Sequence, residues 1–184
     1  AAGLVAVKLV VLNIMPFDNK SEFQVVLNMP EGSTLKKTPR TLVNLHPVLN
    51  RVPEVKDYQL YAGTSAPMNF NGLVRQYYLR NQPYQGDIQV NLIDKGERKR
   101  QSHQIAMAVR PALTAIARRF HAHMVVAEVP PGPPVMAPIV AEIYGPDYQD
   151  QRAVARSTGK LFASTPGIAD VNLSVEKAQA TRQL

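Results

Sequence analysis

The four histidines are the residues best suited to metal chemistry, and two of them are closely spaced. His121 and His123 are separated by one residue, which would let both imidazoles approach the same ion. Zinc requires a third and usually a fourth ligand, but the chain has no cysteine and no carboxylate at a recognisable spacing from this pair. We therefore expect no metal and no cofactor, and we interpret the pair as solvated residues at the end of a helix.

Catalytic motifs are absent from the sequence. It contains no G-x-S-x-G, H-E-x-x-H, phosphate-binding or dinucleotide-binding pattern, and without cysteine there is no thiol nucleophile. Asp94 and Glu97 are close in sequence, but they lie in a basic loop beside Lys95 and Arg98. Solvated carboxylates of this kind are not tuned for acid–base work. We expect the chain not to be an enzyme.

The charge balance is basic, with 21 Lys and Arg against 14 Asp and Glu and a formal net charge of +7. Such a charge permits an anionic partner without requiring one. Sheets that bind RNA need aromatic side chains on their central strands. The expected strands 87–93 and 124–129 carry none, and Tyr58 and Tyr61 would lie on opposite faces of theirs. We therefore expect no nucleic-acid partner.

A loop at residues 62–72 is the strongest candidate for ligand contact. It is too rich in Gly, Pro, Ser and Asn to predict regular structure. Two interpretations of its large apolar residues stay open: they contact a ligand, or they tuck into the core. Met136 lies in a second proline-rich loop, at 131–138, which also contains Pro133 and Pro134. The candidate residues of the first loop are Gly63, Thr64, Ser65, Pro67, Met68, Asn69, Phe70, Asn71 and Gly72.

The periodicity of apolar residues predicts three strand–helix–strand units. The first has strands at 22–29 and 55–61 around a helix that ends near residue 51, with Leu35 and Leu42 on its apolar face. The second places a helix at 102–119, between strands 87–93 and 124–129, with Met107 and Met124 as core filler. Two such units complete an α+β sandwich, the ferredoxin-like split βαβ fold. The third would be incomplete, with strands 139–144 and 170–175 around a helix that ends near residue 164.

The same patterns suggest how the chain is divided. Residues 1–15 include an apolar run that is too short to span a membrane, so they are a lead-in segment or the tail of a membrane helix. Residues 16–130 would form one subdomain. Residues 131–138 would form a stiff, extended connector, because four of these eight residues are proline. Residues 139–184 would begin a second subdomain that lacks a partner unit.

Several short motifs, taken in order, resemble the second large periplasmic loop of resistance–nodulation–division (RND) efflux permeases. The resemblance extends from about Leu9 to Val175, and its specificity comes from the combination of motifs. They are residues 15–23 (MPFDNKSEF), 29–32 (MPEG), 52–55 (VPEV), 87–92 (DIQVNL), 128–134 (EVPPGPP) and 143–145 (IYG).

This resemblance implies a role in transport. Residues 16–130 would be the first porter subdomain of the loop, and 139–184 the first half of the next. The whole protein would be a proton-driven homotrimeric multidrug exporter in a Gram-negative inner membrane, working with a periplasmic adaptor and an outer-membrane channel on small amphiphilic substrates. The loop at 62–72 would be a substrate gate whose glycines act as hinges, with Pro133, Pro134 and Met136 in the adjoining cleft.

The resemblance also bears on the cargo. Heavy-metal pumps of the family line this cleft with methionines, whereas this chain has Val26 and the prolines 133–134 near those places. That difference disfavours copper or silver. The alternative to the transport interpretation is a free-standing soluble ferredoxin-like module that binds a metal or an anion.

Overall fold

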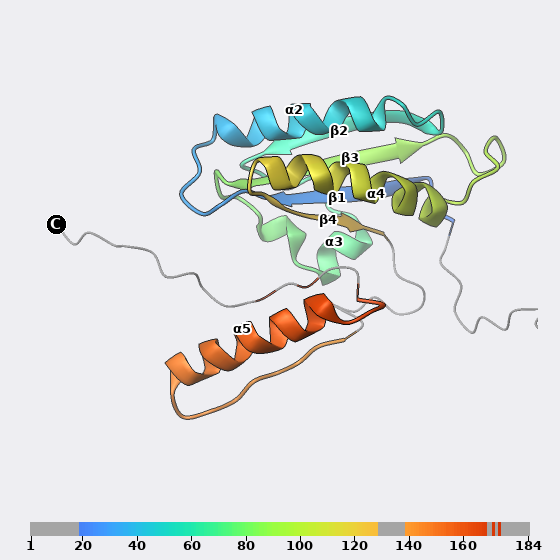
Figure 1. Cartoon of the computed structure of the whole chain (residues 1–184). Coiled ribbons are helices and arrows are strands. Elements are labelled where there is room, and N and C mark those ends of the chain that lie inside the picture. Colours follow the sequence, from blue (N-terminus) through green and yellow to red (C-terminus); the bar gives the residue numbers. More distant parts are fainter. Residues whose placement is uncertain (1–18, 129–138, 169–170, 172, 174–184) are drawn as a thin grey trace, which may run out of the picture. The chain divides into compact units, whose positions relative to one another are not determined.

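The computed structural model describes residues 19–128, 139–168, 171 and 173. The chain divides into two compact units, Ala1–Met136 and Ala137–Leu184. Figure 1 shows their elements. The two units are described separately.

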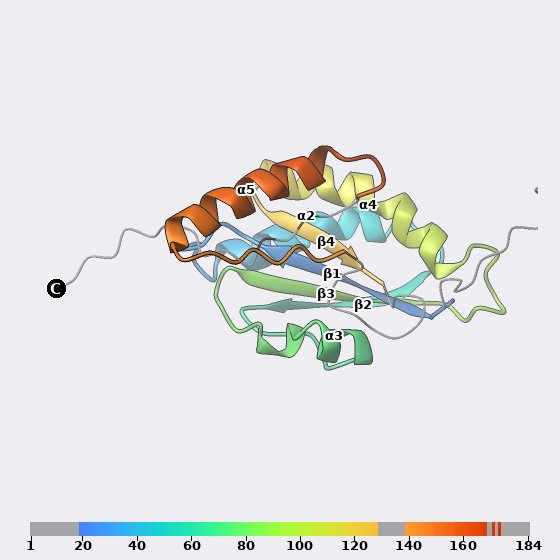
Figure 2. The same cartoon turned by 90° about the horizontal axis from the view of Figure 1, so that it is seen from below.

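The first unit is built on an antiparallel sheet. Within the described residues its strands are β1 (Glu22–Asn28), β2 (Val55–Ala62), β3 (Gln85–Leu92) and β4 (His123–Ala127), in the order β2-β3-β1-β4. The helices α2 (Lys37–Leu49) and α4 (Ser102–Arg119) connect β1 to β2 and β3 to β4, and both cover the same face (Figure 2). This is the α+β ferredoxin-like split βαβ arrangement that the sequence predicts.

The core lies between this face of the sheet and the two helices. Alternate residues of β1 point into it, Val25 and Leu27 among them, and they meet Ile88 and Val90 from β3 and Leu45 from α2. Helix α2 approaches β3 so closely that a Cβ on Gly86 would lie 2.9 Å from Thr38 Cγ2. The close approach requires glycine there.

Two residues expected in the core are on the surface. Leu35 is 51% exposed because α2 begins only at Lys37, which places Leu35 in the turn before the helix. Met107 is 49% exposed because it lies on the opposite side of α4 from Ile105, whereas Met124 is buried as expected. In α2 and α4 the apolar stripes are otherwise those that the spacing predicts. In the helix of the second unit, the spacing predicts Val154 and Leu161 on the apolar face, but they are 49% and 64% exposed.

The basic loop after β3 is more ordered than a solvated charge run. Arg98 is buried and donates hydrogen bonds to the backbone carbonyls of Lys20, Ile93 and Arg100 at 2.7–3.1 Å. Arg100 forms a two-pronged ion pair with Glu54 at 2.5–2.7 Å. Two of the four cations in this loop therefore fasten the chain, Arg98 as a buried residue and Arg100 with a side chain that is 40% exposed.

The connection from β2 to β3 also contains regular structure. Helix α3 (Phe70–Val74) and the 3₁₀ turn η1 (Tyr77–Leu79) interrupt it, so the prediction of an irregular loop through residue 72 is wrong at its end. The Asn69 side chain explains the difference, because its Oδ1 accepts the Gly72 amide at 2.6 Å and so caps the first turn.

The second unit contains α5 (Tyr148–Ser164), which begins where the Asp147 carboxylate accepts the amides of Gln149 and Asp150 at 2.7 and 3.0 Å. The expected strand at 139–144 is not formed. Ile139 and Val140 are more than 60% exposed, and the described part of this unit offers no second strand with which to pair. Most of the expected strand at 170–175 lies outside the described residues, as do residues 1–15 and the connector 131–138.

None of the helices in the described ranges is long and apolar enough to cross a membrane.

The burial of α2 predicts that alanine substitutions at two nearby positions, 43 and 45, lower the free energy of unfolding by very different amounts. Leu45 is fully buried, and truncation to alanine should lower the free energy of unfolding by about 2–5 kcal/mol because it leaves a cavity. Val43 is 57% exposed, so Val43→Ala should change it by no more than about 0.5 kcal/mol. Urea unfolding of both variants measures the difference, and equal losses would contradict the placement of α2.

Candidate functional site

The candidate site lies on the face of the sheet that α2 and α4 leave uncovered. The register pairs Gln24 with Gln89 and Val26 with Asp87 on this face. All four are at least nine-tenths buried, although three of them are polar. Both faces of the two central strands, β1 and β3, are therefore packed.

Residues 63–80, which we call the strap, connect β2 to β3 across one end of this face. Figure 1 shows α3, the middle of the strap, on the side of the sheet opposite α2 and α4. The strap begins at Gly63, whose φ of +68° is one that other residues rarely adopt. Its amide donates to the Gln85 carbonyl at 2.8 Å, and the Leu35 side chain fills the space where a Cβ would be.

The Asp87 carboxylate on β3 holds both ends of the strap. Its Oδ2 accepts the Ala66 amide at 3.1 Å, and its Oδ1 accepts Nε of Arg80 at 2.9 Å. Asp87 is fully buried, and Arg80 is 8% exposed. One carboxylate therefore closes a loop that runs from residue 66 to residue 80.

Arg80 connects this carboxylate to the ends of two strands. Its Nη1 donates to Asn28 Oδ1 at 2.7 Å. Its Nη2 donates to the carbonyls of Leu27 and Gly86, at 2.8 and 3.3 Å. Because Leu27 and Gly86 are opposite each other in the β1–β3 register, the guanidinium spans the end of that ladder.

Burial raises the pKa of the Asp87 carboxyl above its ordinary value of 3.8, and the nearby Arg80 guanidinium and Ala66 amide offset only part of this rise. The charged carboxylate is thus less favourable in the fold than in the unfolded chain. The ion pair accordingly fixes a position without being a net source of stability.

Apolar side chains on the outer part of the strap face solvent. Met68 is 63% exposed, and Leu73, Tyr78 and Leu79 are between 41 and 59% exposed. This group, which we call the apolar cluster, gathers on a segment whose hydrogen bonds hold it to the sheet. Such a surface is suited to contact with an apolar or amphiphilic molecule, and it contains no nucleophile or acid–base pair.

The sequence-predicted residues of the loop occupy different positions within the strap. Thr64 and Pro67 are exposed, and Ser65 is half-buried. Gly72 lies within α3 and is buried. Phe70 and Asn71 form the start of α3, where only the backbone is described. Pro133, Pro134 and Met136 lie outside the described residues.

The residues that organise the strap were missed by the sequence interpretation. Ala66, Arg80 and Asp87 form no motif, and Asp87 reads as an ordinary polar position of a half-buried strand. Asp87 lies on a central strand, and Arg80 precedes it by seven residues. This spacing indicates an ion pair only once the strand order is known.

The histidines lie apart from the strap. His121 and His123 are exposed, and His46 contacts the hydroxyl of Tyr58. His103 Nδ1 lies 3.1 Å from Glu128, whose pKa is raised by burial. In the ranges that the structure describes, no three His, Asp or Glu side chains are grouped as metal ligands.

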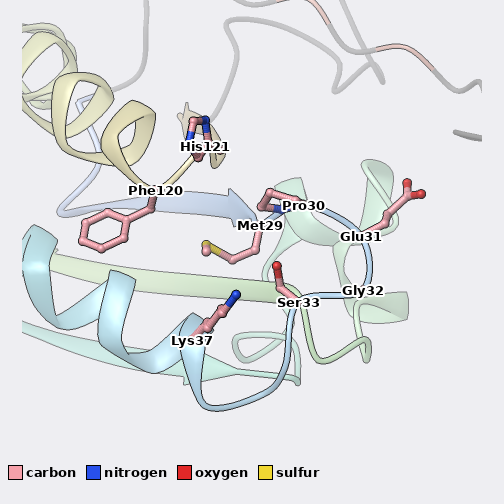
Figure 3. Close-up of a pocket in the computed structure, with 8 residues that line it drawn as sticks. All are labelled: Met29, Pro30, Glu31, Gly32, Ser33, Lys37, Phe120 and His121. Carbon is pink, nitrogen blue, oxygen red and sulfur yellow. The ribbon is translucent and has the colours of Figure 1, made fainter.

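A separate open cavity of about 320 Å³ lies where β1 leads into α2 and α4 ends (Figure 3). Figure 3 shows the Lys37 side chain extending toward Met29, with Glu31 directed away. Among the residues that line this cavity, Met29 is the one that is buried. The polar lining residues are at least partly exposed, so none is held in place by burial. We therefore assign the cavity no ligand. The lining residues are Met29, Pro30, Glu31, Gly32, Ser33, Lys37, Phe120 and His121.

Comparison with solved structures identifies similar folds in transport proteins. One is an X-ray structure of a heavy metal efflux pump in crystal form II, with 18% identity and a TM-score of 0.55. Another, of such a pump in crystal form I, has 16% identity and a TM-score of 0.58. Each match covers 90% of this chain and 17% of the pump chain. No protein-family model and no curated protein matches the sequence.

The likeness to these pumps shows the fold of the chain. The chain spans about a sixth of the pump chains that it matches. The α+β sandwich described above is thus an architecture that occurs within heavy metal efflux pumps.

The raised pKa of Asp87 predicts a pH dependence. A carboxyl with a raised pKa in the fold contributes stability that is fully present below its ordinary value of 3.8 and is lost as the pH rises through the folded value. The parent chain and the Asp87→Asn variant should therefore differ in free energy of unfolding by an amount that depends on pH. The advantage of the parent over the variant should decrease from about pH 3 to about pH 7. Urea unfolding at several pH values measures it, with the exposed Asp94→Asn as control. A difference that grows with pH would contradict the prediction.

Proposed function

We propose that this chain is a periplasmic porter segment of an RND exporter. The observation that carries the proposal is the agreement of two independent features. The sequence motifs resemble the second periplasmic loop of that family, and the fold is similar, over 90% of the chain, to part of heavy metal efflux pumps. A ferredoxin-like fold alone occurs with many functions, so the motifs supply the specificity.

In this proposal the intact protein is a homotrimer in a Gram-negative inner membrane, with a periplasmic adaptor and an outer-membrane channel as partners. The chain contributes to the substrate pathway and catalyses no reaction by itself. The exposed apolar cluster on the strap supports this role, because several large apolar side chains exposed on one short segment are typical of a binding surface.

We propose small amphiphilic molecules as the cargo. The pumps of similar fold are described as heavy metal pumps, but two features of this chain favour another cargo. Val26, near the place of a metal-binding methionine in the resembling pumps, is a buried aliphatic residue of β1. Met124 is buried in the core, where its thioether packs against apolar side chains instead of facing a pathway.

The strap supplies the test of this proposal. Met68→Ala in the intact transporter should lower resistance to bulky amphiphilic compounds by up to about fivefold, because one apolar contact contributes about 1 kcal/mol. Met107→Ala is the matched control, since Met107 is also an exposed methionine but lies on α4. Minimum inhibitory concentrations in an efflux-deficient host measure the effect at equal expression.

A changed range of exported compounds for Met68→Ala, with Met107→Ala unchanged, would support the strap as a cargo contact. An unchanged range for both variants, with normal expression and trimer formation, would contradict it. Silver or copper resistance conferred by the intact transporter would overturn the proposed class of cargo.

A further inference from the structure

We infer that Arg80 and Asp87 are positioning residues, which together determine where the apolar cluster of the strap lies. The inference deepens the proposed function, because it names the pair that would place the cargo-contacting side chains. It starts from a topological fact: the carboxylate of Asp87 binds residue 66 through one oxygen and residue 80 through the other.

Between these two attachments the described hydrogen bonds stay within the strap. The Asn69 side chain accepts the Gly72 amide, and the backbone amides of Leu73, Gln76, Leu79 and Arg80 donate to carbonyls three or four residues before them. Met68, Leu73 and Leu79 are exposed, whereas Val74, Arg75 and Tyr77 are half-buried. Apart from this partial burial, the position of the apolar cluster rests on the two ends of the loop.

Ala66 and Arg80, the two attached ends of the loop, meet at the Asp87 carboxylate, where the guanidinium of Arg80 has little freedom to move. Arg80 distributes its donors over Asp87, Asn28 and two strand carbonyls, so a shift of the guanidinium would break several hydrogen bonds at once. Loss of either charged partner would leave the other buried and unpaired, which is strongly unfavourable. The strap would then leave the sheet to return the remaining charge to water.

This arrangement differs from a gate that bends at its glycines. Gly63 is held by the Gln85 carbonyl and by Leu35, and Gly72 is buried in a helical turn. We instead assign the position of residues 66–80 to the buried Asp87 carboxylate. Release of that carboxylate would change the position of all the apolar side chains together.

The absence of cysteine in the chain allows a direct distance measurement. Nitroxide labels on Met68→Cys in the strap and Val43→Cys on α2 are both at exposed positions. We expect a narrow distance distribution in the otherwise native chain. Asp87→Asn and Arg80→Gln should each broaden it, whereas the exposed substitutions Asp94→Asn and Arg51→Gln should leave it unchanged.

Hydrogen exchange separates this effect from general unfolding. In Asp87→Asn the amides of residues 66–80 should exchange roughly tenfold or more faster, while those of β1 and β3 stay protected. Arg80→Lys should not restore the narrow distribution, because an ammonium cannot reach the four acceptors in the geometry of the guanidinium fork.

If a single variant fails to fold, the pair Arg80→Leu with Asp87→Leu removes both charges and leaves no buried ion. A folded double variant with a broad distribution would support the inference. A narrow distribution in Asp87→Asn or in the folded double variant would overturn it. The distance and hydrogen-exchange measurements test the positioning role without measuring transport. If the strap is displaced in a variant but export by the intact transporter is unchanged, the positioning role stands and the proposed function is contradicted.

Discussion

A single buried carboxylate organises the face of the sheet that the helices do not cover. Asp87 lies on a central strand, and its neighbours in the β1–β3 register determine that it points away from the core. Since it accepts hydrogen bonds from Ala66 and Arg80, it must remain buried for the strap to keep its place. The cost of that burial explains its raised pKa and limits what the ion pair adds to stability.

A second buried arginine fastens the chain at the other end of the sheet. Arg98 donates to three carbonyls of irregular segments, whereas the two carbonyls that accept from Arg80 belong to β1 and β3. Irregular backbone leaves carbonyls without partners in a helix or ladder, and a guanidinium can satisfy several of them. Part of the basic charge is therefore structural, and this weakens net charge as a guide to the partners of the chain.

The second unit illustrates how much a strand depends on its neighbours. Helix α5 forms because its cap and amphipathic spacing are local properties. The segment 139–144 has an apolar composition typical of a strand, but a strand is stabilised by hydrogen bonds to another strand. Its large apolar residues, such as Ile139 and Tyr144, are exposed instead. This is consistent with the proposal that the chain is a segment of a longer porter.

The sequence by itself determined the α+β class, the split βαβ order and most of the core, because helix and strand periodicities are local and residues such as Leu42, Val90 and Ile105 follow them. It also located the β2–β3 connection as the candidate for ligand contact. It did not reveal that Leu35 and Met107 are exposed, or that Arg98 is buried. Only the tertiary structure brought Ala66, Arg80 and Asp87 together, because contacts between a loop and a central strand arise from the strand order and register and leave no periodic pattern in the sequence.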